Sequence, residues 1–163
     1  IPTILRLATA YGYSKRMRFD LAVNLMTSRG LDEGRVKVFG GKQYRPFVHC
    51  EDIASAFISV LEAEEKKIAR EVFNVGSNEQ NYRLEELGAL IGETMGVSVN
   101  VLPEMEDERS YRVDFSKMNW LLGFEAKRKI KESVLEIKQK FNIGEFSDWR
   151  DDKYYNVRYD YML

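Results

Sequence analysis

The stretch RPFVHCED at residues 45–52 carries the clearest structural signal in this sequence. Together with Tyr44, its first part alternates side chains in the manner of a short strand, and residues 51–64 then repeat apolar side chains at the spacing of an amphipathic helix. Pro46 indicates that the strand lies at a sheet edge or that the proline stands near the strand's start. The acids at positions 51 and 52 suit the positive end of the helix dipole. A strand that passes directly into a helix is a unit from which α/β folds are built.

Further strands and helices lie on both sides of this stretch. The apolar spacing predicts strands at residues 3–8, 35–39, 44–49, 72–75 and 97–102, and helices at 19–29, 51–64, 84–95, 116–122 and 130–141. Three of the helices are expected to end at glycines, namely Gly30, Gly96 and Gly123. We expect strand 3–8 to be buried, and residues 147–163 to form an extended tail that wraps the domain or a partner chain. Because strands and helices alternate throughout, the fold class is α/β or α+β.

The composition is that of an ordinary globular protein. The 163 residues are 44% hydrophobic and 31% charged, and the net charge of −1 gives no reason to expect nucleic acid or an anionic membrane as a partner. No apolar run approaches the roughly 20 residues that cross a bilayer. The single cysteine, Cys50, excludes an internal disulfide and fits a reducing, cytoplasmic compartment. A single histidine, His49, argues against a zinc centre, so no metal site is expected.

The sequence has no Gly-rich turn of the kind that binds a dinucleotide. Such a turn joins a strand to a helix, so that backbone amides and the helix N-terminus meet the pyrophosphate. Gly40-Gly41 follows a strand but leads to another strand, which predicts a tight β-turn. Tyr11 and Lys15 have the Tyr-x-x-x-Lys spacing of an acid–base pair, but Gly12 and Ser14 disfavour the helix that would bring them together. We therefore expect this match to be coincidental, and no catalytic residue is assigned.

Arginines in two places have the chemistry of an anion site, because a planar guanidinium matches phosphate oxygens. Arg45 is either such a phosphate ligand or the partner of Glu51 or Asp52 in a surface salt bridge. The stretch RSYRVDFSK at residues 109–117 follows a run of acids, and it either grips a diphosphate and a ribose or forms a solvated loop. His49, alone at the end of a strand, is expected to be a packed structural side chain rather than a base.

Seven stretches, taken in order, resemble the C-terminal half of the extended short-chain dehydrogenase/reductase family. More narrowly, the chain is similar to nucleoside-diphosphate-sugar epimerases and dehydratases, which act as isomerases, lyases or oxidoreductases. The matching stretches cover about 120 residues: LRLATAYG at 5–12, VN at 23–24, VKVFG at 36–40, RPFVH with ED at 45–52, FNVG at 73–76, RSYRVDFSK at 109–117 and LGF at 122–124. The resemblance implies a Rossmann-type α/β fold whose C-terminal part is mostly the small mixed α/β substrate-binding domain.

The resemblance also implies substrate-binding residues. Asn24 matches an Asn that contacts the sugar diphosphate at the start of the substrate helix, and Val38 and Phe39 match the strand whose backbone meets the nucleotide base. Arg45 matches the Arg that binds the diphosphate, and Arg109 matches a second phosphate-binding Arg. These five positions are the predicted contacts with the nucleotide-sugar.

The expected cofactor is NAD or NADP. Leu7 and Ala8 match family positions near the nicotinamide, and the family usually has Asn where this sequence has Thr9. The family's Gly-rich loop and its Tyr-x-x-x-Lys pair precede the matched segment. We therefore expect that the dinucleotide does not bind this chain alone and that the chain alone is inactive.

The resemblance finally implies an organisation. Residues 1–163 are expected to form one incomplete unit, in which 1–12 complete the Rossmann sheet, 13–141 form the substrate-binding region with interleaved Rossmann elements, and 142–163 form the tail. The expected partners are a nucleotide-sugar, the N-terminal half of the same protein and a second copy of the parent enzyme. The alternative is a non-catalytic module that binds a nucleotide-sugar or serves assembly. In either case, an uncovered strand 3–8 would make the segment prone to self-association.

Overall fold

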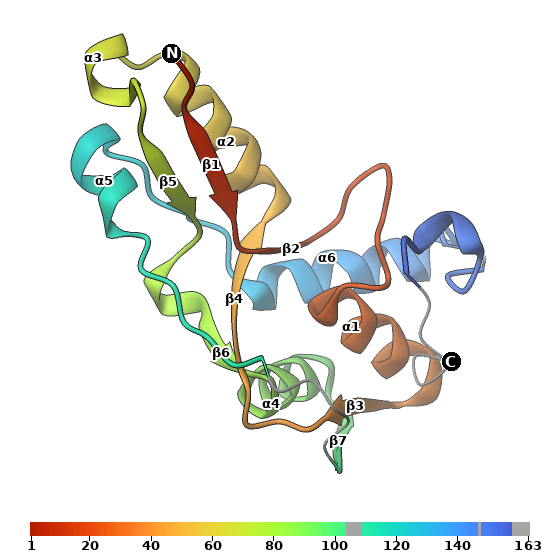
Figure 1. Ribbon diagram of the computed structural model, residues 1–163. Coiled ribbons are helices and arrows are strands. Elements are labelled where there is room, and N and C mark those ends of the chain that lie inside the picture. Colours follow the sequence, from red (N-terminus) through yellow and green to blue (C-terminus); the bar gives the residue numbers. More distant parts are fainter. Residues whose placement is uncertain (104–108, 147, 158–163) are drawn as a thin grey trace.

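The computed structural model describes residues 1–103, 109–146 and 148–157 (Figure 1). Its helices are α1 (Ala22–Glu33), α2 (Cys50–Leu61), α3 (Glu65–Ile68), α4 (Leu84–Met95), α5 (Ser116–Leu122) and α6 (Ile130–Asn142), with single 3₁₀ turns at Asn78–Gln80 and Asp152–Tyr154. Its strands are β1 (Ile4–Leu7), β2 (Thr9–Tyr11), β3 (Arg35–Phe39), β4 (Tyr44–His49), β5 (Val72–Val75), β6 (Asn81–Arg83) and β7 (Ser98–Leu102). The expected α/β class is confirmed.

Three small sheets organise the described residues. In the first, β1 runs parallel to β5, with Ile4 opposite Val72. In the second, β4 pairs parallel with β2 and antiparallel with β6, and in the third β3 runs parallel to β7. The chain passes from the first sheet to the second at Ala8, between β1 and β2. Figure 1 shows β1 and β5 with α2, α3 and α5 in one lobe, and β3 and β7 with α1 and α4 in the other.

The second lobe contains the largest hydrophobic core. Helices α1, α4 and α6 pack against one another, and α1 and α4 also pack against β3. Val36 and Val38 point from β3 into this core and meet Leu87 and Ile91 of α4. The chain bends after β3, where Gly40 and Gly41 both have positive φ angles, 77° and 115°.

The predicted end of the first helix at Gly30 is wrong. Helix α1 continues through Gly30 and ends at Gly34, whose φ is 68°. A Cβ at this position would stand 2.1 Å from the terminal carbon of Met95 in α4. The glycine therefore allows two helices to approach closely. By contrast, the ends predicted at Gly96 and Gly123 are confirmed, since both glycines are left-handed C-caps.

The position predicted for Pro46 needs correction, because β4 is the central strand of its sheet. Residues 44–46 pair with β6 on one side, and residues 47–49 pair with β2 on the other side. Pro46 lies where the pairing changes from one neighbour to the other, which is a place where a strand tolerates a residue without a backbone N–H.

The expected burial of strand 3–8 is also wrong for the described structure. Ile4 and Leu7 of β1 are 50% and 46% exposed, because only one edge of β1 is paired among the described residues.

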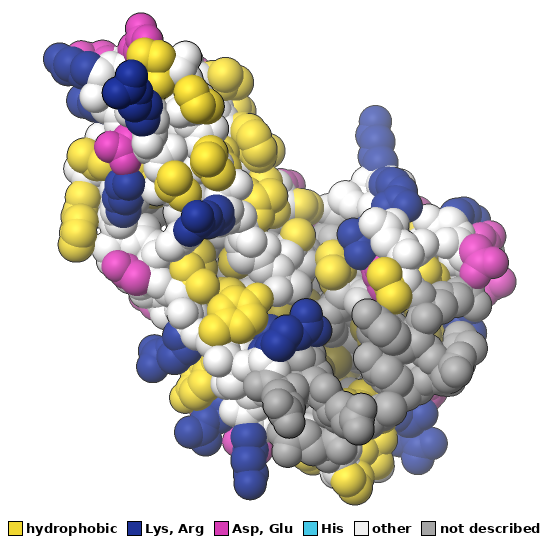
Figure 2. Space-filling model, viewed as in Figure 1, with side chains coloured by type: hydrophobic (Ala, Val, Ile, Leu, Met, Phe, Trp, Pro, Cys, Tyr) yellow, Lys and Arg dark blue, Asp and Glu magenta, His cyan; other side chains and the backbone are white. Residues whose placement is uncertain are grey.

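The helix predicted at 51–64 ends at Leu61, after which the chain turns and begins α3. Its apolar side chains Phe57 and Leu61 are exposed. Figure 2 shows hydrophobic side chains gathered on this lobe. The face of the first lobe formed by β1 and α2 is therefore apolar and uncovered.

The described part of the predicted tail packs on its own domain. Trp149 and Tyr154 join Phe19, Phe141 and Phe146 in a cluster of aromatic rings with mostly edge-to-face contacts. The expected packing on the domain is thus confirmed for residues 148–157, but the expected extended conformation is wrong, since these residues form turns and the 3₁₀ helix Asp152–Tyr154. Positions 147 and 158–163 of the prediction lie outside the described residues.

Candidate functional site

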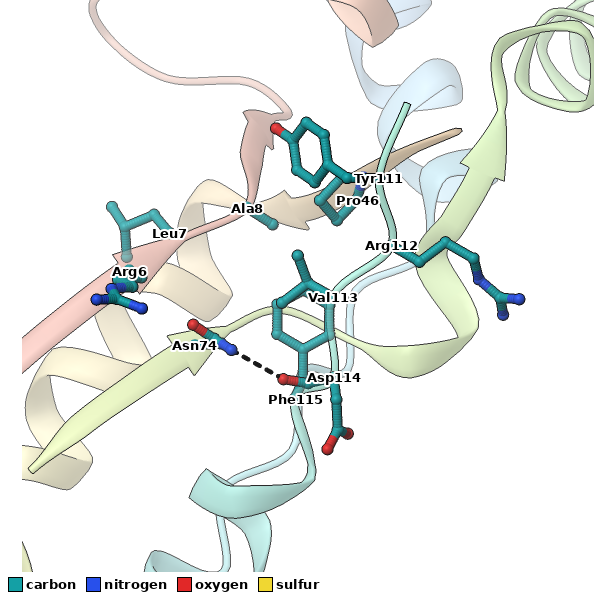
Figure 3. A pocket seen from close by; sticks show the side chains of 10 residues that line it. All are labelled: Arg6, Leu7, Ala8, Pro46, Asn74, Tyr111, Arg112, Val113, Asp114 and Phe115. Carbon is teal, nitrogen blue, oxygen red and sulfur yellow. Dashed lines mark hydrogen bonds between the residues drawn. The ribbon is translucent and has the colours of Figure 1, made fainter. Parts of the chain in front are cut away.

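A cavity of about 440 Å³ opens at the carboxyl end of β1 (Figure 3). Its lining residues are Arg6, Leu7, Ala8, Pro46, Asn74, Tyr111, Arg112, Val113, Asp114 and Phe115. In open α/β sheets, ligands bind in the crevice outside the carboxyl ends of parallel strands. The two predicted cofactor-binding residues, Leu7 and Ala8, form part of one wall of this cavity.

The opposite wall is the extended segment 111–115. Tyr111 and Val113 lie toward the cavity in Figure 3, whereas the charged ends of Arg112 and Asp114 point away from it. Arg112 stacks on the ring of Tyr44 at 5.3 Å. The Asp114 carboxylate accepts bonds from the backbone N–H and the hydroxyl of Ser116, at 3.0 and 2.6 Å, and these bonds lower the pKa of Asp114. The wall therefore presents an aromatic and an aliphatic side chain.

Asparagine side chains hold this wall in place. The Asn81 side chain accepts a bond from the Val113 N–H at 2.9 Å and donates one to the Val113 carbonyl at 3.1 Å. The Asn78 Oδ1 accepts from the Phe115 N–H at 2.9 Å, and the Asn74 amide donates to the Asp114 carbonyl at 3.1 Å. These bonds satisfy backbone groups of the extended segment 111–115, as a neighbouring strand would do. They therefore fix the position of the segment relative to β5 and β6.

Arg45 lies behind the same wall. Its Nη1 donates to the carbonyls of Tyr44, at 2.8 Å, and of Arg109, and its guanidinium stands 5.4 Å from the centre of the Tyr111 ring. The alternative salt bridge of Arg45 with Glu51 or Asp52 does not form. Asp52 accepts the backbone N–H groups of residues 127 and 128, and Glu51 pairs with the Arg128 side chain. The structure therefore brings the predicted residues Arg45 and Arg109 together beside the cavity.

The other predicted substrate-binding residues lie away from the cavity. Asn24 is buried, where its Oδ1 accepts from the Gly12 N–H at 3.1 Å and its Nδ2 donates to the Arg18 carbonyl at 2.9 Å. Asn24 thus joins the two ends of the loop that follows β2. Val38 is fully buried in the core, and Phe39 ends β3 beside the guanidinium of Arg29.

His49 has the structural role expected for it. Its Nδ1 accepts the N–H of Glu51 at 3.1 Å and so caps α2. Its ring meets the edge of the Tyr11 ring at 5.3 Å between centroids. Burial lowers the pKa of His49 below its usual value, so the neutral form is favoured.

The Tyr11–Lys15 match is a coincidence of spacing, as predicted. Tyr11 ends β2, and no helix joins it to Lys15, which is exposed. The Tyr11 hydroxyl is buried and lies 2.7 Å from Gln80 Oε1 and 3.0 Å from the carbonyl of Arg128. Burial raises the pKa of Tyr11 far above its usual value, which is the opposite of what a catalytic base requires.

Arg6 was not predicted from the sequence as a site residue. It lines the cavity from β1, opposite Asn74 of β5. The sequence feature that could have identified Arg6 is its charge, since it stands between the apolar residues Leu5 and Leu7 of a predicted strand. The contributions of Pro46, Asn74 and Phe115 had no signal of this kind, because they depend on contacts between distant segments.

Within the described residues, no three His, Cys, Asp or Glu side chains come together as a metal site requires. None of the described helices is long and apolar enough to cross a membrane.

Comparison with known proteins gives consistent matches. The model of the NAD dependent epimerase/dehydratase family matches residues 2–76. Among solved structures, the UDP-glucuronic acid 4-epimerase from Bacillus cereus, in complex with UDP-glucuronic acid and NAD, superposes with a TM-score of 0.68 at 28% identity, over 84% of this chain and 45% of that chain. The UDP-glucose 4-epimerase from Thermotoga maritima, with UDP-glucose, superposes with a TM-score of 0.72 at 26% identity, over 88% of this chain and 46% of that chain.

A third structure shows the fold alone. The dTDP-glucose 4,6-dehydratase from Streptomyces venezuelae superposes with a TM-score of 0.69 at 19% identity, over 88% of this chain and 44% of that chain. The chain thus spans less than half the length of each of these three structures.

Proposed function

Because the chain belongs to the NAD-dependent epimerase/dehydratase family, within the extended short-chain dehydrogenases/reductases, we propose that it is the nucleotide-sugar-binding portion of such an enzyme. The observation that carries the proposal is the cavity at the carboxyl end of β1, with the segment 109–115 fastened over it by Arg45. The position of the cavity, the aromatic wall and the arginines beside it suit a ligand with a sugar ring and a diphosphate.

Each predicted residue has a role in this proposal. Arg45 and Arg109 bind the diphosphate, and Arg45 also sets the position of Tyr111. The backbone of Val38 and Phe39 meets the nucleotide base. Asn24 acts on the substrate through the loop whose two ends it joins, since both polar groups of its side chain already bind that loop.

The cofactor would meet the first wall of the cavity. NAD or NADP would accept and return a hydride at the reacting sugar carbon, and Leu7 and Ala8 are the residues of this chain that would face its nicotinamide. The acid–base pair and the dinucleotide turn would come from residues other than these 163, so the chain alone has no activity. Remote contacts of the nucleotide and diphosphate then place the sugar for the reaction.

The uncovered face of the first lobe is consistent with this arrangement. In the proposed parent enzyme, β1 and β5 continue a larger parallel sheet, and the exposed side chains of Ile4, Phe57 and Leu61 pack against its remaining part. Residues 1–12 would complete that sheet, 13–141 would form the substrate-binding region with interleaved Rossmann elements, and 142–163 would be the tail. We further propose a cytoplasmic homodimeric parent, in keeping with the single cysteine.

Nucleotide-sugar binding by this chain tests the proposal. Ligand-observed NMR would compare UDP-, dTDP-, GDP- and CDP-sugars with NAD and NADP. We expect one class of nucleotide-sugar to bind with a dissociation constant of about 1 mM, which corresponds to about 4 kcal/mol. Arg45→Ala should weaken this binding by about tenfold or more, since about 1.4 kcal/mol of charge-assisted contact is removed.

Arg35→Ala is the matched control, because Arg35 is an exposed arginine of β3 whose ion pair with Glu33 is long, at 3.8 Å. It should bind like the parent chain. Equal binding by the parent chain and Arg45→Ala would contradict the proposed diphosphate site. Binding of NAD or NADP in preference to every nucleotide-sugar would contradict the proposal as a whole.

A further inference from the structure

A second cavity, of about 360 Å³, opens at the carboxyl end of β5 and shares only Phe115 with the cavity described above. Its volume lies in the range of small ligand pockets. One side of it is formed by α5 and the chain that follows this helix, which contribute Asn119, Trp120 and Glu125. The proposed function gives this second cavity no role.

The end of α5 brings Glu125 back beside the helix. Gly123 has a φ of 69° and donates its N–H to the Asn119 carbonyl at 2.7 Å, so the chain reverses at this glycine. The Asn119 side chain then donates to Oε1 of Glu125 at 2.9 Å. The carboxylate of Glu125 is thus oriented by a neighbouring amide, and its other oxygen has no bond to a described residue.

Glu125 gives the second cavity a negative charge that has no counter-ion in the part of the chain that the structure describes. The other two charged residues that line the cavity, Glu79 and Lys129, form an ion pair with each other at 2.5 Å. The next basic residues along the chain, Lys127 and Arg128, do not line the cavity. The cavity therefore favours a ligand group with a positive charge.

Trp120 adds a flat aromatic surface to the same cavity. Its side chain is 78% exposed, and its indole makes no hydrogen bond or ring contact with any described residue. Among aromatic side chains, tryptophan attracts cations most strongly to its face. A cation that stacks on this indole can also meet the carboxylate of Glu125, because both side chains line one cavity.

The second cavity lies on the side of the sheet away from β1. Lys117 of α5 donates to the Val72 carbonyl of β5 at 3.1 Å, and Figure 1 shows β5 between β1 and α5. In the proposed parent enzyme, the remaining part of the sheet joins the other edge of β1. That part would leave the second cavity open to other molecules.

We propose that the second cavity is a docking site for a partner protein, and that it receives an arginine side chain of this partner between Trp120 and Glu125. The occupant follows from charge complementarity with Glu125 and from the exposed indole. A planar guanidinium can stack on an aromatic ring and donate parallel hydrogen bonds to a carboxylate, which the ammonium of lysine cannot do. Tryptophan and arginine are also the side chains most enriched among those that dominate the binding energy of protein interfaces.

The indole N–H signals of the two tryptophans test this proposal in the isotope-labelled chain. Trp120 lines the second cavity, whereas Trp149 is buried in the aromatic cluster and serves as the internal control. The chain is titrated with blocked tripeptides that carry arginine, lysine or glutamine between two glycines, at millimolar concentration. We expect the arginine peptide to shift the Trp120 signal and not the Trp149 signal. The lysine peptide should act more weakly, and the glutamine peptide should have no effect.

Three variants separate charge recognition from simple contact with the indole. Glu125→Gln should weaken binding of the arginine peptide by about tenfold, which is the effect of one charge-assisted contact. Trp120→Ala should abolish the amide shifts that the peptide causes in residues 119–125. Glu93→Gln is the matched control, because Glu93 is an exposed glutamate of α4 outside both cavities, and it should bind like the parent chain.

Equal shifts of Trp120 with all three peptides would overturn the proposal, since they would show contact with the ring without recognition of charge. An unchanged affinity in Glu125→Gln, or no response to the arginine peptide, would overturn it as well. Both positions are exposed, and an amide correlation spectrum of each variant confirms that it is folded. These outcomes are independent of the proposed function, because Trp120 and Glu125 lie outside the first cavity.

Discussion

At the scale of single residues, the junction of β2, β4 and α2 depends on a glycine. Gly12 has a φ of 102°, and a Cβ at this position would stand 2.2 Å from Nε2 of His49. His49 in turn caps α2 and touches Tyr11. The buried imidazole of His49 therefore belongs to the last residue of β4, lies against the turn after β2 and caps the start of α2. A change at His49 acts on all three elements together.

This arrangement predicts a pH dependence of stability. Burial lowers the pKa of His49 in the folded chain, so the unfolded chain takes up a proton first as the pH falls through about 6.5. The unfolded state then binds more protons than the native state, and the free energy of unfolding decreases by at most about 1.4 kcal/mol per pH unit. Urea unfolding at pH 7.5 and pH 5.5 measures the effect.

His49→Asn separates titration from capping, because Asn is a good N-cap and does not titrate in this range. His49 is the only histidine of the sequence, so the variant removes all histidine titration. We expect the variant to be less stable than the parent chain at both pH values, since packing against Gly12 and Tyr11 is lost. Its stability should change little between the two. An unchanged pH dependence in the variant would show that other groups cause it.

At the scale of elements, the spacing of apolar residues and glycines correctly predicted the bounds of those helices and strands that depend on neighbouring residues. Residues 35–39, 44–49 and 72–75 form strands with the predicted bounds, and the helices at 84–95 and 116–122 begin and end where their spacing and their glycines indicated. The errors have distant causes. Gly30 lies inside a helix at its contact with Met95 of α4, and Pro46 lies mid-sheet because its strand changes partners there.

The candidate site was less predictable for the same reason. Arg45 and Arg109 were singled out by residue type and resemblance, but their contact runs through a side chain and a carbonyl that are 64 positions apart. The internal bonds of Asn24 and the place of Arg6 opposite Asn74 depend on backbone positions that no spacing encodes. Predictions that rest on residue type identify the chemistry, whereas the partners of each side chain follow from the assembled fold.

The contact between the tail and the loop after β2 gives an element-scale prediction. Asp20 Oδ2 accepts the N–H groups of Asn156 and Val157, at 3.0 and 3.2 Å, and Asp20 pairs with Arg18 at 2.7 Å. Burial opposes ionisation of Asp20, but these bonds outweigh it and lower the pKa of Asp20. This stabilisation is complete above about pH 4 and is lost as the pH falls through the lower pKa of the folded chain.

Trp149 reports on this contact because it is buried beside Phe19, whose N–H donates to the Tyr154 carbonyl at 3.0 Å. In a Trp120→Phe background, which removes the exposed indole, Trp149 fluorescence should shift to the red in acid. Asp20→Asn should weaken the contact already at neutral pH and reduce the acid response. Glu145, whose pKa is lowered by Tyr13 and Lys140, accounts for the remainder. A response that is the same with and without Asp20 would contradict this prediction.

At the scale of the whole molecule, the two lobes differ in how well they are covered. The lobe with α1 and α4 encloses a continuous core, whereas the lobe with β1 and α2 leaves apolar side chains in solvent. Large exposed apolar patches on soluble domains usually mark an interface. The proposed parent enzyme gives this face a partner within the same protein, and the cavity lies beside it.

The uncovered face predicts that the chain self-associates. Sedimentation velocity should show dimers or larger species that increase with concentration, because one edge of β1 is unpaired among the described residues and α2 offers Phe57 and Leu61. Leu61→Lys should shift the distribution toward the monomer, because Leu61 is 82% exposed and its loss removes little from the core. Ser55→Lys, at an exposed polar position on another side of the same helix, controls for the added charge. A stable monomer at all concentrations would contradict the prediction.

The most direct test of nucleotide-sugar binding is a titration of the isotope-labelled chain with UDP-glucose, followed by amide chemical shifts. We predict perturbations at Leu7, Ala8 and the segment 109–115, at the walls of the cavity, with little change in the aromatic cluster around Phe19. Shifts confined to another part of the chain, or an unchanged spectrum with every nucleotide-sugar at millimolar concentration, would contradict the claim that this cavity is the binding site.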